Sequence, residues 1–446
     1  MRDAPTTALL TDRYELTMLE AALRSGAAHR RCVFEVFARR LPPGRRYGVV
    51  AGTDRFLDAL ERFRFDDDAL RWLADKHVVD EPTLRWLDEY RFRGDIDGYA
   101  EGDAFFPGSP ILTVESTFAE AVLLETLALS IFNHDCAIAA AASRMTSAAG
   151  DRPCLEMGSR RTHEESAVAA ARAAYLAGFA ATSNLEAGRR YAVPTTGTSA
   201  HAFTLIHDDE RGAFSAQVES LGAGTTLLVD TYDVAAAVRT AIEVAGPSLG
   251  AVRLDSGDLL ETARRVRAQL DDLGATKTRV IVTSDLDEHA IASLAAAPVD
   301  GYGVGTSVVT GSGAPTANLV YKLVARADGT GPDAAWRAVT KASPGKIDHG
   351  GRKSAYRRFS PDGVAVAEIV RSELPGDRAR AEAPGAERAL SVALVRGGDV
   401  VGREPLDRAR ARHAAARASL PAQAVRLQPG EPALTTIFFD QAGRRS

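Results

Sequence analysis

A short segment between residues 252 and 259 gathers side chains that can perform chemistry. It reads Val-Arg-Leu-Asp-Ser-Gly-Asp-Leu, an apolar strand that ends in Arg253, Asp255, Ser256 and Asp258. The residues from Leu259 to Leu270 then carry apolar side chains at helical spacing. The pattern predicts a strand, a tight turn and a helix, with polar groups at the strand end where α/β folds bind ligands. Taken alone, it is better explained by a simple helix cap with Arg253 as its ion-pair partner.

The same pattern recurs along the chain. Other short apolar segments end in Asp230, in Ser284 and Asp285, and in a Gly-rich turn that contains Gly303, Gly305 and Thr306. Their spacing is that of successive βα units. Four such units with polar groups at the same end favour a (β/α) barrel whose site lies on one face.

Two upstream turns add further candidate residues. Arg160 and Arg161 follow a strand-like segment, and adjacent arginines can bind a carboxylate or phosphate through paired hydrogen bonds. Neutralisation of Glu164 and Glu165 explains the arginine pair equally well. His201 follows a turn that contains Thr198. A lone histidine is usually a structural hydrogen-bonding group, but beside such a turn it is a candidate nucleophile or acid/base.

Composition limits the class of protein. The 446 residues are 45% hydrophobic and 25% charged, as in ordinary globular proteins, and the length predicts at least two domains. The net charge of −5 argues against a nucleic-acid partner. Three widely separated cysteines indicate neither a disulfide framework nor a zinc site, which favours a reducing cytoplasm. The sequence identifies no metal ligands.

Periodicity predicts an α/β protein with three segments. Residues 1–117 are expected to form an N-terminal helix and an α+β domain, with Asp12 and Glu15 as a capping box. Residues 118–330 are expected to form the (β/α) barrel-like catalytic domain, and residues 331–446 to return to the N-terminal domain. The apolar stretch Phe118 to Ala149 is interrupted by charges, whereas a membrane span needs about 20 predominantly apolar residues in succession. A buried helix or a broken helix pair is therefore expected, and no membrane segment.

The motifs in their order and spacing resemble those of nicotinate phosphoribosyltransferases. The matching motifs are Thr-Asp-Arg-Tyr-Glu-Leu-Thr-Met at 11–18, Glu-Met-Gly-Ser-Arg-Arg at 156–161, Gly-Thr-Ser-Ala-His at 197–201, Arg-Leu-Asp-Ser-Gly-Asp-Leu at 253–259, Gly-Val-Gly-Thr at 303–306 and Tyr-Lys-Leu at 321–323. The resemblance implies an irregular (β/α) barrel joined to a second α+β domain, and a homodimer with sites at the interface. It also implies an enzyme of NAD salvage, of the ligase and glycosyltransferase type. Such an enzyme forms nicotinate mononucleotide and pyrophosphate from nicotinate and phosphoribosyl pyrophosphate, with coupled ATP hydrolysis and Mg²⁺.

The resemblance also implies roles for individual residues. His201 would be transiently phosphorylated by ATP. Tyr14 would stack on the pyridine ring from the neighbouring subunit, although packing is the more frequent fate of such an aromatic. Thr198, Arg253 and one or both of Arg160 and Arg161 would bind nicotinate or a nearby phosphate. Gly303, Gly305 and Thr306 would hold the 5-phosphate, and Ser284 would lie near the ribose hydroxyls. Ser256 is also expected to bind substrate. Asp255 and Asp285 would stabilise positive charge that develops on the ribose.

Three alternatives remain at this stage. A nicotinamide phosphoribosyltransferase would favour an acidic residue near Thr198, where Ser199 and Ala200 offer none. A quinolinate phosphoribosyltransferase would need more positive charge for two carboxylates and no ATP step. The third alternative is a barrel that binds a phosphorylated metabolite without catalysis.

Overall fold

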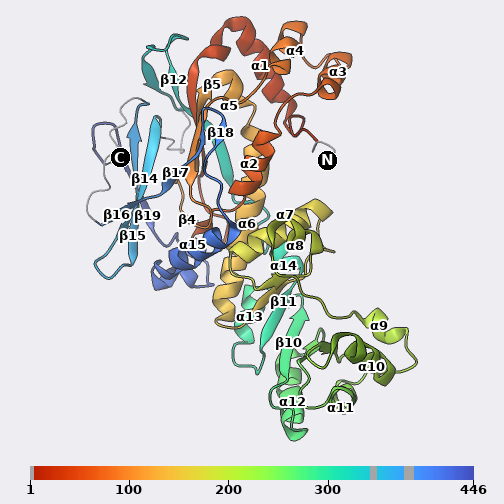
Figure 1. Ribbon diagram of the computed structural model, residues 1–446. Coiled ribbons are helices and arrows are strands. Elements are labelled where there is room, and N and C mark those ends of the chain that lie inside the picture. Colours follow the sequence, from red (N-terminus) through yellow and green to blue (C-terminus); the bar gives the residue numbers. More distant parts are fainter. Residues whose placement is uncertain (1–4, 342–348, 376–385, 446) are drawn as a thin grey trace. The chain divides into compact units, whose positions relative to one another are not determined.

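The computed structural model describes residues 5–341, 349–375 and 386–445 (Figure 1). The chain forms two compact units, one from residues 1–137 with 314–446 and the other from residues 138–313. We expected boundaries after residues 117 and 330, whereas the division falls inside the helix α6 (Glu125–Ala149) and before strand β12 (Leu319–Ala327). The reason is packing, because Leu127, Ile131 and Phe132 of α6 belong to the hydrophobic core of the first unit.

The first unit is built on an antiparallel sheet whose strands come from distant parts of the chain. Its seven strands run in the order β13-β12-β1-β5-β3-β17-β18. Their bounds are β1 Arg31–Ala38, β3 Asp95–Tyr99, β5 Leu112–Thr117, β12 Leu319–Ala327, β13 Trp336–Ala338, β17 Ser391–Arg396 and β18 Asp399–Val400. In the centre of the sheet, Phe34 of β1 pairs with Val114 on one side and Leu323 on the other. Because β17 pairs with β3, strands from both ends of the chain share this sheet.

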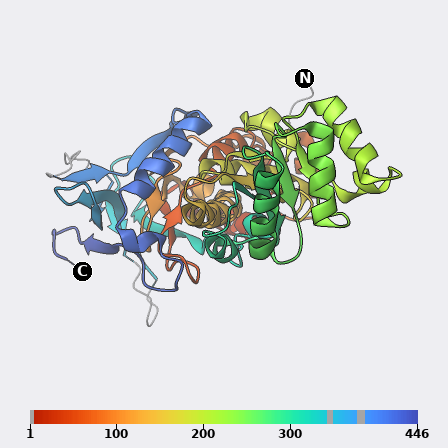
Figure 2. The same ribbon diagram turned by 90° about the horizontal axis from the view of Figure 1, so that it is seen from below.

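The first unit also contains short helices. They are α1 Arg13–Ser25, α2 Thr53–Glu61, α3 Asp67–Asp75, α4 Glu81–Asp88, α5 Phe118–Val122 and α15 Leu406–Ala418, with 3-10 turns at Ala27–His29 and Ala422–Val425. Those from α1 to α5 contribute to the core of this sheet. The blue helix α15 lies beside N-terminal segments in Figure 2, and Arg412 of α15 donates a 2.6 Å hydrogen bond to the carbonyl of Glu101. The C-terminal helix is thereby fixed to the β3–β4 connection.

The N-terminal helix begins where the sequence predicts, but its capping differs. Asp12 is the N-cap of α1 and makes no side-chain cap hydrogen bond. The predicted capping box is therefore wrong. The Glu15 carboxylate is buried and accepts hydrogen bonds from Thr11 and from the backbone and hydroxyl of Thr126, the backbone contact being 2.9 Å. Glu15 thus ties α1 to the start of α6 instead of closing its own first turn.

Two smaller sheets complete the first unit. One has the order β16-β14-β15-β19, with β14 Arg352–Phe359, β15 Ala365–Glu373, β16 Glu387–Ala389 and β19 Thr435–Phe439. The other pairs β2 Gly48–Val49 with β4 Ala104–Phe105. Lys353 of β14 reaches Glu35 of the large sheet through a buried ion pair, with Nζ and Oε2 2.6 Å apart. Such a pair is tolerated in a core because each charge compensates the other.

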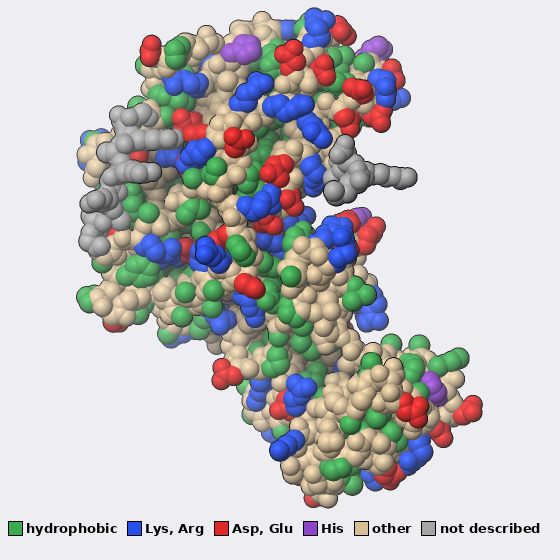
Figure 3. Space-filling view, in the orientation of Figure 1, with side chains coloured by type: hydrophobic (Ala, Val, Ile, Leu, Met, Phe, Trp, Pro, Cys, Tyr) green, Lys and Arg blue, Asp and Glu red, His purple; other side chains and the backbone are tan. Residues whose placement is uncertain are grey.

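The apolar stretch from Phe118 to Ala149 is a broken helix pair, one of the two predicted alternatives. The helix α5 ends at Val122 and α6 begins at Glu125. By length and composition this stretch is the one candidate for a membrane span among the described residues, and 67% of its apolar window is buried inside the protein. Burial of this kind is typical of a core helix. Side chains of both charge signs are intermixed on the face of the molecule that Figure 3 shows.

The second unit is the predicted α/β element. Its six strands are all parallel, in the order β7-β6-β11-β10-β9-β8, and form a curled open sheet rather than a closed ring within the described residues. The strands are β6 Cys154–Glu156, β7 Ala181–Thr182, β8 Thr226–Leu228, β9 Ala251–Leu254, β10 Arg279–Ser284 and β11 Gly301–Val304. The helices between and after them are α7 Glu164–Leu176, α8 Leu185–Tyr191, α9 His201–Leu205, α10 Glu210–Leu221, α11 Val234–Ala245, α12 Leu259–Asp272, α13 Glu288–Ser293 and α14 Thr306–Val309. Parallel strands place all their carboxyl ends at one edge, which fixes where a site can form.

Candidate active site

One cavity of the second unit lies at the carboxyl ends of the parallel strands. It measures about 240 Å³. Nine of the residues that the sequence predicted for the site line it: Arg160, Arg161, Arg253, Asp255, Ser284, Asp285, Gly303, Gly305 and Thr306. They come from four turns that are far apart in the sequence. The parallel register of β6, β11, β10 and β9 brings these turns to the same edge of the sheet.

Three arginines give the cavity its positive charge. Arg160 and Arg161 follow β6, and Arg253 lies on β9. None of the three forms an ion pair with a carboxylate among the residues that the structure describes. Neutralisation of Glu165 is instead supplied by Arg190, with Nη1 and Oε2 2.8 Å apart. The alternative prediction was that Arg160 and Arg161 neutralise Glu164 and Glu165 at the start of α7. For Glu165 this role is filled by Arg190.

Arg253 is held with part of its guanidinium uncommitted. Its Nη1 donates a 2.7 Å hydrogen bond to the hydroxyl of Thr198. Its buried Nε has no hydrogen-bond partner within the described part of the chain. Desolvation lowers the pKa of Arg253, although the neighbouring carboxylates of Asp255 and Asp230 act in the opposite direction. A partly buried guanidinium with a free donor is suited to bind a carboxylate or phosphate.

The acidic side of the cavity is formed by the turns after β9 and β10. The hydroxyl of Thr283 donates a short hydrogen bond to Asp255. Ser284 adopts a φ of 152°, and its carbonyl accepts a 2.8 Å hydrogen bond from the amide of Leu286. This tight turn exposes Asp285 at the edge of the sheet. Two carboxylates, of Asp255 and Asp285, therefore line the same space as the three arginines.

Two glycines near the strand ends, Gly303 in β11 and Gly158 after β6, are required by close packing. A Cβ on Gly303 would lie 2.4 Å from Cγ2 of Thr283 and 2.8 Å from Sδ of Met157. A Cβ on Gly158 would lie 2.2 Å from Cγ1 of Val309. The absence of side chains lets the strands β6, β10 and β11 approach closely at the floor of the site. Gly305 precedes α14, and Thr306 is the first residue of that helix.

His201 does not line this cavity, but hydrogen bonds connect it to the same edge. Its Nε2 lies 3.2 Å from Oδ1 of Asp230, which follows β8. The other oxygen of Asp230 accepts 2.8 Å hydrogen bonds from the amide of Asp255 and the hydroxyl of Ser256. The side chain of Asp230 is only 3% exposed, whereas that of His201 is 40% exposed. Asp230 therefore orients a solvent-accessible imidazole.

Tyr14 lies in the other unit, on α1. Its side chain is 44% exposed. Desolvation and the negative charge of Glu125 raise the pKa of the Tyr14 hydroxyl to about 12, so it stays protonated at neutral pH. An exposed aromatic on a helix is free to contact another molecule.

Three residues of the site were missed by the sequence-based prediction. Asp230 was recognised as a polar strand end but not assigned to the site. Thr283 and Met157 line the cavity and were not considered. The signal for Asp230 was its position at the end of β8, equivalent to that of Asp255 at the end of β9. Thr283 carries no such signal, because an inward-facing threonine in a strand looks like any β-branched core residue.

Comparisons with known proteins identify the family. A family model described as the nicotinate phosphoribosyltransferase (NAPRTase) N-terminal domain matches residues 9–133. The chain is 59% identical to nicotinate phosphoribosyltransferase pncB1 of Mycobacterium tuberculosis over 436 residues, covering 96% of this chain and 94% of that protein. It is 39% identical to nicotinate phosphoribosyltransferase of Bacillus subtilis over 359 residues, or 78% and 72% of the two chains.

A solved structure agrees with the fold. The crystal structure of human nicotinic acid phosphoribosyltransferase superposes with a TM-score of 0.80 at 24% sequence identity, covering 96% of this chain and 97% of the human one. The predicted α/β fold, an irregular (β/α) barrel with a second α+β domain built from the N- and C-terminal segments, is confirmed, and the barrel element is a curled, half-barrel parallel sheet. With its sequence identity to curated relatives over nearly its whole length, the chain belongs to the nicotinate phosphoribosyltransferase family.

Proposed function

We propose that the protein transfers the phosphoribosyl group of phosphoribosyl pyrophosphate to nicotinate, forming nicotinate mononucleotide and pyrophosphate in NAD salvage. The observation that carries the proposal is the cavity at the strand ends. Three arginines without carboxylate partners in the described chain meet two carboxylates there. Such a site fits a substrate that combines negatively charged phosphate and carboxylate groups with a ribose that becomes positively charged during the reaction.

The chemistry follows from the positions of these groups. The pyridine nitrogen of nicotinate attacks C1 of the ribose, and the bond from C1 to the pyrophosphate oxygen breaks, with the electron pair leaving on pyrophosphate. Arg253 and Thr198 hold the nicotinate carboxylate, which places the nitrogen toward C1 and lowers the entropic barrier. Asp255, fixed by Thr283, and Asp285 stabilise positive charge on the sugar. The turn with Gly303, Gly305 and Thr306 holds the 5-phosphate.

The cavity could hold Mg²⁺ only if phosphate oxygens of the substrate complete its set of ligands. Among the described residues, no three His, Cys, Asp or Glu side chains are grouped so that they could hold a metal ion. Mg²⁺ in such enzymes is commonly bound by one or two carboxylates plus phosphate oxygens. Asp255 and Asp285 would supply the carboxylates, and the bound ion would neutralise the departing pyrophosphate.

The proposal includes coupling to ATP through His201. Phosphoryl transfer needs an imidazole that ATP can reach and that is held in a fixed orientation. His201 is 40% exposed, and Asp230 lies 3.2 Å from its Nε2. Asp230 also holds the turn of Asp255 and Ser256, so a change of charge at His201 is communicated to the substrate cavity. This connection supports a phosphohistidine that alters the affinity for substrate or product.

We further propose a cytoplasmic homodimer in which Tyr14 stacks on the pyridine ring in the neighbouring subunit. Tyr14 and Met18 are 44% and 36% exposed and lie four residues apart on α1, and Leu10, in the segment before that helix, is 62% exposed. Such a stripe on a helix is suited to contact a second copy of the chain. The three cysteines are buried free thiols, which fits a reducing compartment.

The test is pyrophosphate release from phosphoribosyl pyrophosphate with nicotinate, nicotinamide and quinolinate in parallel, with and without ATP. The variants are His201→Ala and, as a matched control, His207→Ala. His207 lies near His201 after α9, and its ring contacts the carbonyl of Phe203 at 2.8 Å. We expect turnover with nicotinate, stimulated by ATP in the wild type and in His207→Ala but not in His201→Ala. Turnover with nicotinamide or quinolinate instead would contradict the substrate assignment, and no turnover would contradict the enzyme assignment.

A further inference from the structure

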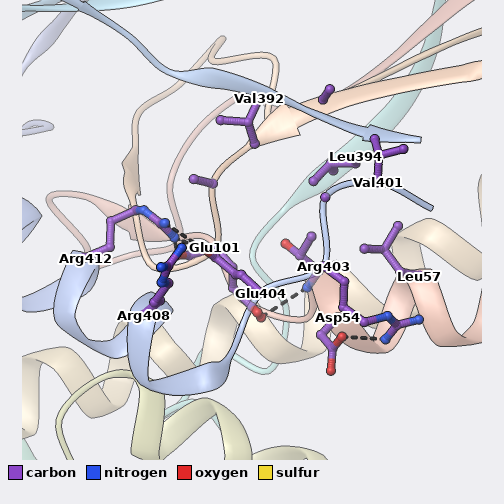
Figure 4. Close-up of a pocket in the computed structure, with 14 residues that line it drawn as sticks. Asp54, Leu57, Glu101, Val392, Leu394, Val401, Arg403, Glu404, Arg408 and Arg412 are labelled. Carbon is purple, nitrogen blue, oxygen red and sulfur yellow. Dashed lines mark hydrogen bonds and ion pairs between the residues drawn. The ribbon is translucent and has the colours of Figure 1, made fainter. Parts of the chain in front are cut away.

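Ion pairs within the protein account for most of the charged side chains at a cavity of the first unit. This cavity measures about 250 Å³ and is lined by α2, the connection before β4, strand β17 and the segment that leads into α15 (Figure 4). Arg403 pairs with Asp54 at 2.6 Å, and Arg412 pairs with Glu404, with 2.7 Å between Nη2 and Oε2. The pairs fix the segment before α15 to α2 and to α15 itself, so their role is structural.

A buried ion pair of the second unit lies next to residues of the strand-end cavity instead. Arg144 of α6 donates a 2.9 Å hydrogen bond from Nε to Oε1 of Glu288, and the two side chains are 6% and 2% exposed. Glu288 is the first residue of α13 and follows Asp285, which lines the cavity, by three positions. The pair therefore anchors the turn that carries Asp285.

The second oxygen of Glu288 holds a different turn. Its Oε2 accepts a 2.6 Å hydrogen bond from the hydroxyl of Ser312. Ser312 follows α14, the helix that begins at Thr306, and its amide donates a 2.6 Å hydrogen bond to the carbonyl of Ser307. One buried carboxylate thus joins the turn of Asp285 to the turn of Thr306.

The backbone at Ser312 is strained. Its φ is 48°, in the left-handed region, and it lies between Gly311 and Gly313, with φ of 65° and 78°. A residue with a Cβ is disfavoured in this region and keeps such a conformation only when its surroundings impose it. The hydrogen bonds of the Ser312 hydroxyl and amide supply that constraint.

The helix α14 depends on contacts of this kind because it is short. It contains four residues, Thr306–Val309, and so short a helix is not stable by itself in water. Its last residue packs tightly against the turn after β6, where a Cβ on Gly158 would lie 2.2 Å from Cγ1 of Val309. The turn that follows is held by Ser312. The position of Thr306 at the cavity therefore depends on residues outside the helix.

We propose that Ser312 and Glu288 are positioning residues for the 5-phosphate of phosphoribosyl pyrophosphate. The hydrogen bond between them holds α14 in the orientation in which Gly305 and Thr306, which line the cavity, meet the phosphate. The ion pair with Arg144 keeps the Glu288 carboxylate in place. This inference rests on the proposed function and adds to it how the phosphate-binding turn is held.

The test is isothermal titration calorimetry of the full-length protein with phosphoribosyl pyrophosphate and Mg²⁺, without nicotinate. Ser312→Ala removes the hydroxyl and keeps the strained backbone, so we expect the Kd to rise about tenfold, as for the loss of a hydrogen bond to a charged group. The matched control is Ser293→Ala on α13, an exposed serine whose hydroxyl donates a 2.7 Å hydrogen bond to the carbonyl of Ala290. The control should leave the Kd unchanged.

Two smaller ligands separate the two ends of the substrate. Ribose 5-phosphate carries the 5-phosphate alone, whereas inorganic pyrophosphate carries the leaving group alone. Ser312→Ala should weaken the binding of ribose 5-phosphate about tenfold and leave that of pyrophosphate unchanged. A general loss of structure would weaken both equally, and that result would overturn the inference.

The role of the carboxylate is tested by a double-mutant cycle. Glu288→Gln leaves one oxygen to serve both Arg144 and Ser312, so it should also weaken the binding of phosphoribosyl pyrophosphate. If Glu288 and Ser312 act through their shared hydrogen bond, Glu288→Gln/Ser312→Ala should bind about as weakly as the weaker single variant. Fully additive losses would contradict a joint role, and the Ser312→Ala titrations decide the matter if Glu288→Gln does not fold.

The outcomes distinguish this inference from the function on which it rests. A wild-type protein that does not bind phosphoribosyl pyrophosphate would contradict both. A wild-type protein that binds it, with an equal Kd in Ser312→Ala, would contradict the role of Ser312 and Glu288 alone.

Discussion

Asp230 lies within hydrogen-bonding distance of His201, with Oδ1 and Nε2 3.2 Å apart, and Asp230 is buried while His201 is accessible. The same carboxylate holds the amide of Asp255 and the hydroxyl of Ser256. One buried acid therefore connects the residue proposed to accept phosphate from ATP with the turn proposed to face the ribose. This connection gives a physical route by which phosphorylation can act on substrate binding.

For Asp230 we predict that Asp230→Asn lowers ATP-stimulated turnover by ~10-fold or more, because a charge-assisted hydrogen bond contributes ~1.5–3 kcal/mol. The amide keeps the size of the side chain but cannot stabilise a positively charged imidazole. The measurement compares turnover with and without ATP, together with ³²P incorporation from labelled ATP. If Asp230→Asn lowered turnover equally with and without ATP and left ³²P incorporation normal, Asp230 would act only by holding the turn of Asp255 and Ser256.

For Arg253 we predict that Arg253→Lys raises the KM for nicotinate by ~10-fold or more, since lysine cannot bind a carboxylate through a planar pair of donors. The hydrogen bond from Nη1 to Thr198 would also be lost. Steady-state kinetics with nicotinate varied at saturating phosphoribosyl pyrophosphate measure the effect. Arg279→Lys provides a control, because Arg279 begins the neighbouring strand β10 at the opposite end from the site. An unchanged KM in Arg253→Lys would remove Arg253 from the nicotinate site.

For the buried ion pair of the first unit we predict that Lys353→Met lowers the free energy of unfolding by about 3–5 kcal/mol, because it leaves the Glu35 carboxylate buried without a counter-charge. Urea denaturation measures the loss. The double variant Glu35→Leu/Lys353→Met should recover much of the stability, since neither charge remains. Arg71→Ala, which breaks an exposed pair with Asp68, should have no measurable effect. A double variant no more stable than Lys353→Met would show that packing, not charge, is responsible.

Glu15 should make the stability of the first unit depend on pH. Burial raises the pKa of Glu15 from 4.5 to about 7, although hydrogen bonds from Thr11 and Thr126 favour the ionised form. Between these two values the folded protein holds a proton that the unfolded chain has released. The stabilisation is therefore complete below pH 4.5 and is lost as the pH rises through about 7.

The measurement is the difference in urea midpoint between wild type and Glu15→Gln at the two ends of this window. The variant has no proton to exchange, so the wild type should lose more stability than the variant as the pH rises. The comparison with the variant is needed because His413 acts in the opposite direction. Burial lowers the pKa of His413 to about 4, so its contribution is present above its ordinary value of 6.5 and is lost as the pH falls. Parallel pH profiles for wild type and Glu15→Gln would refute the assignment for Glu15.

Local patterns in the sequence were sufficient to predict the successive units of strand, turn and helix. Asp255, Ser284 and Thr306 could be placed at strand ends because apolar runs followed by helical periodicity are local features. Parallel strands then bring these ends to one edge, whatever lies between them. For the stretch from Phe118 to Ala149 the charged residues argued against a membrane span, but they left a single buried helix and a broken pair open, and the structure shows the pair, with the break at Leu123 and Leu124.

The tertiary structure decided what distant residues do to one another. Glu15 has the sequence context of a capping residue, yet it is buried against Thr126, a residue 111 positions away. The pairing of Asp230 with His201 likewise depends on how the connection between α9 and β8 folds back. The free Nε donor of Arg253 depends on which partners the fold supplies. Sequence periodicity determines which face of an element is apolar, but long-range packing alone determines which buried polar groups meet.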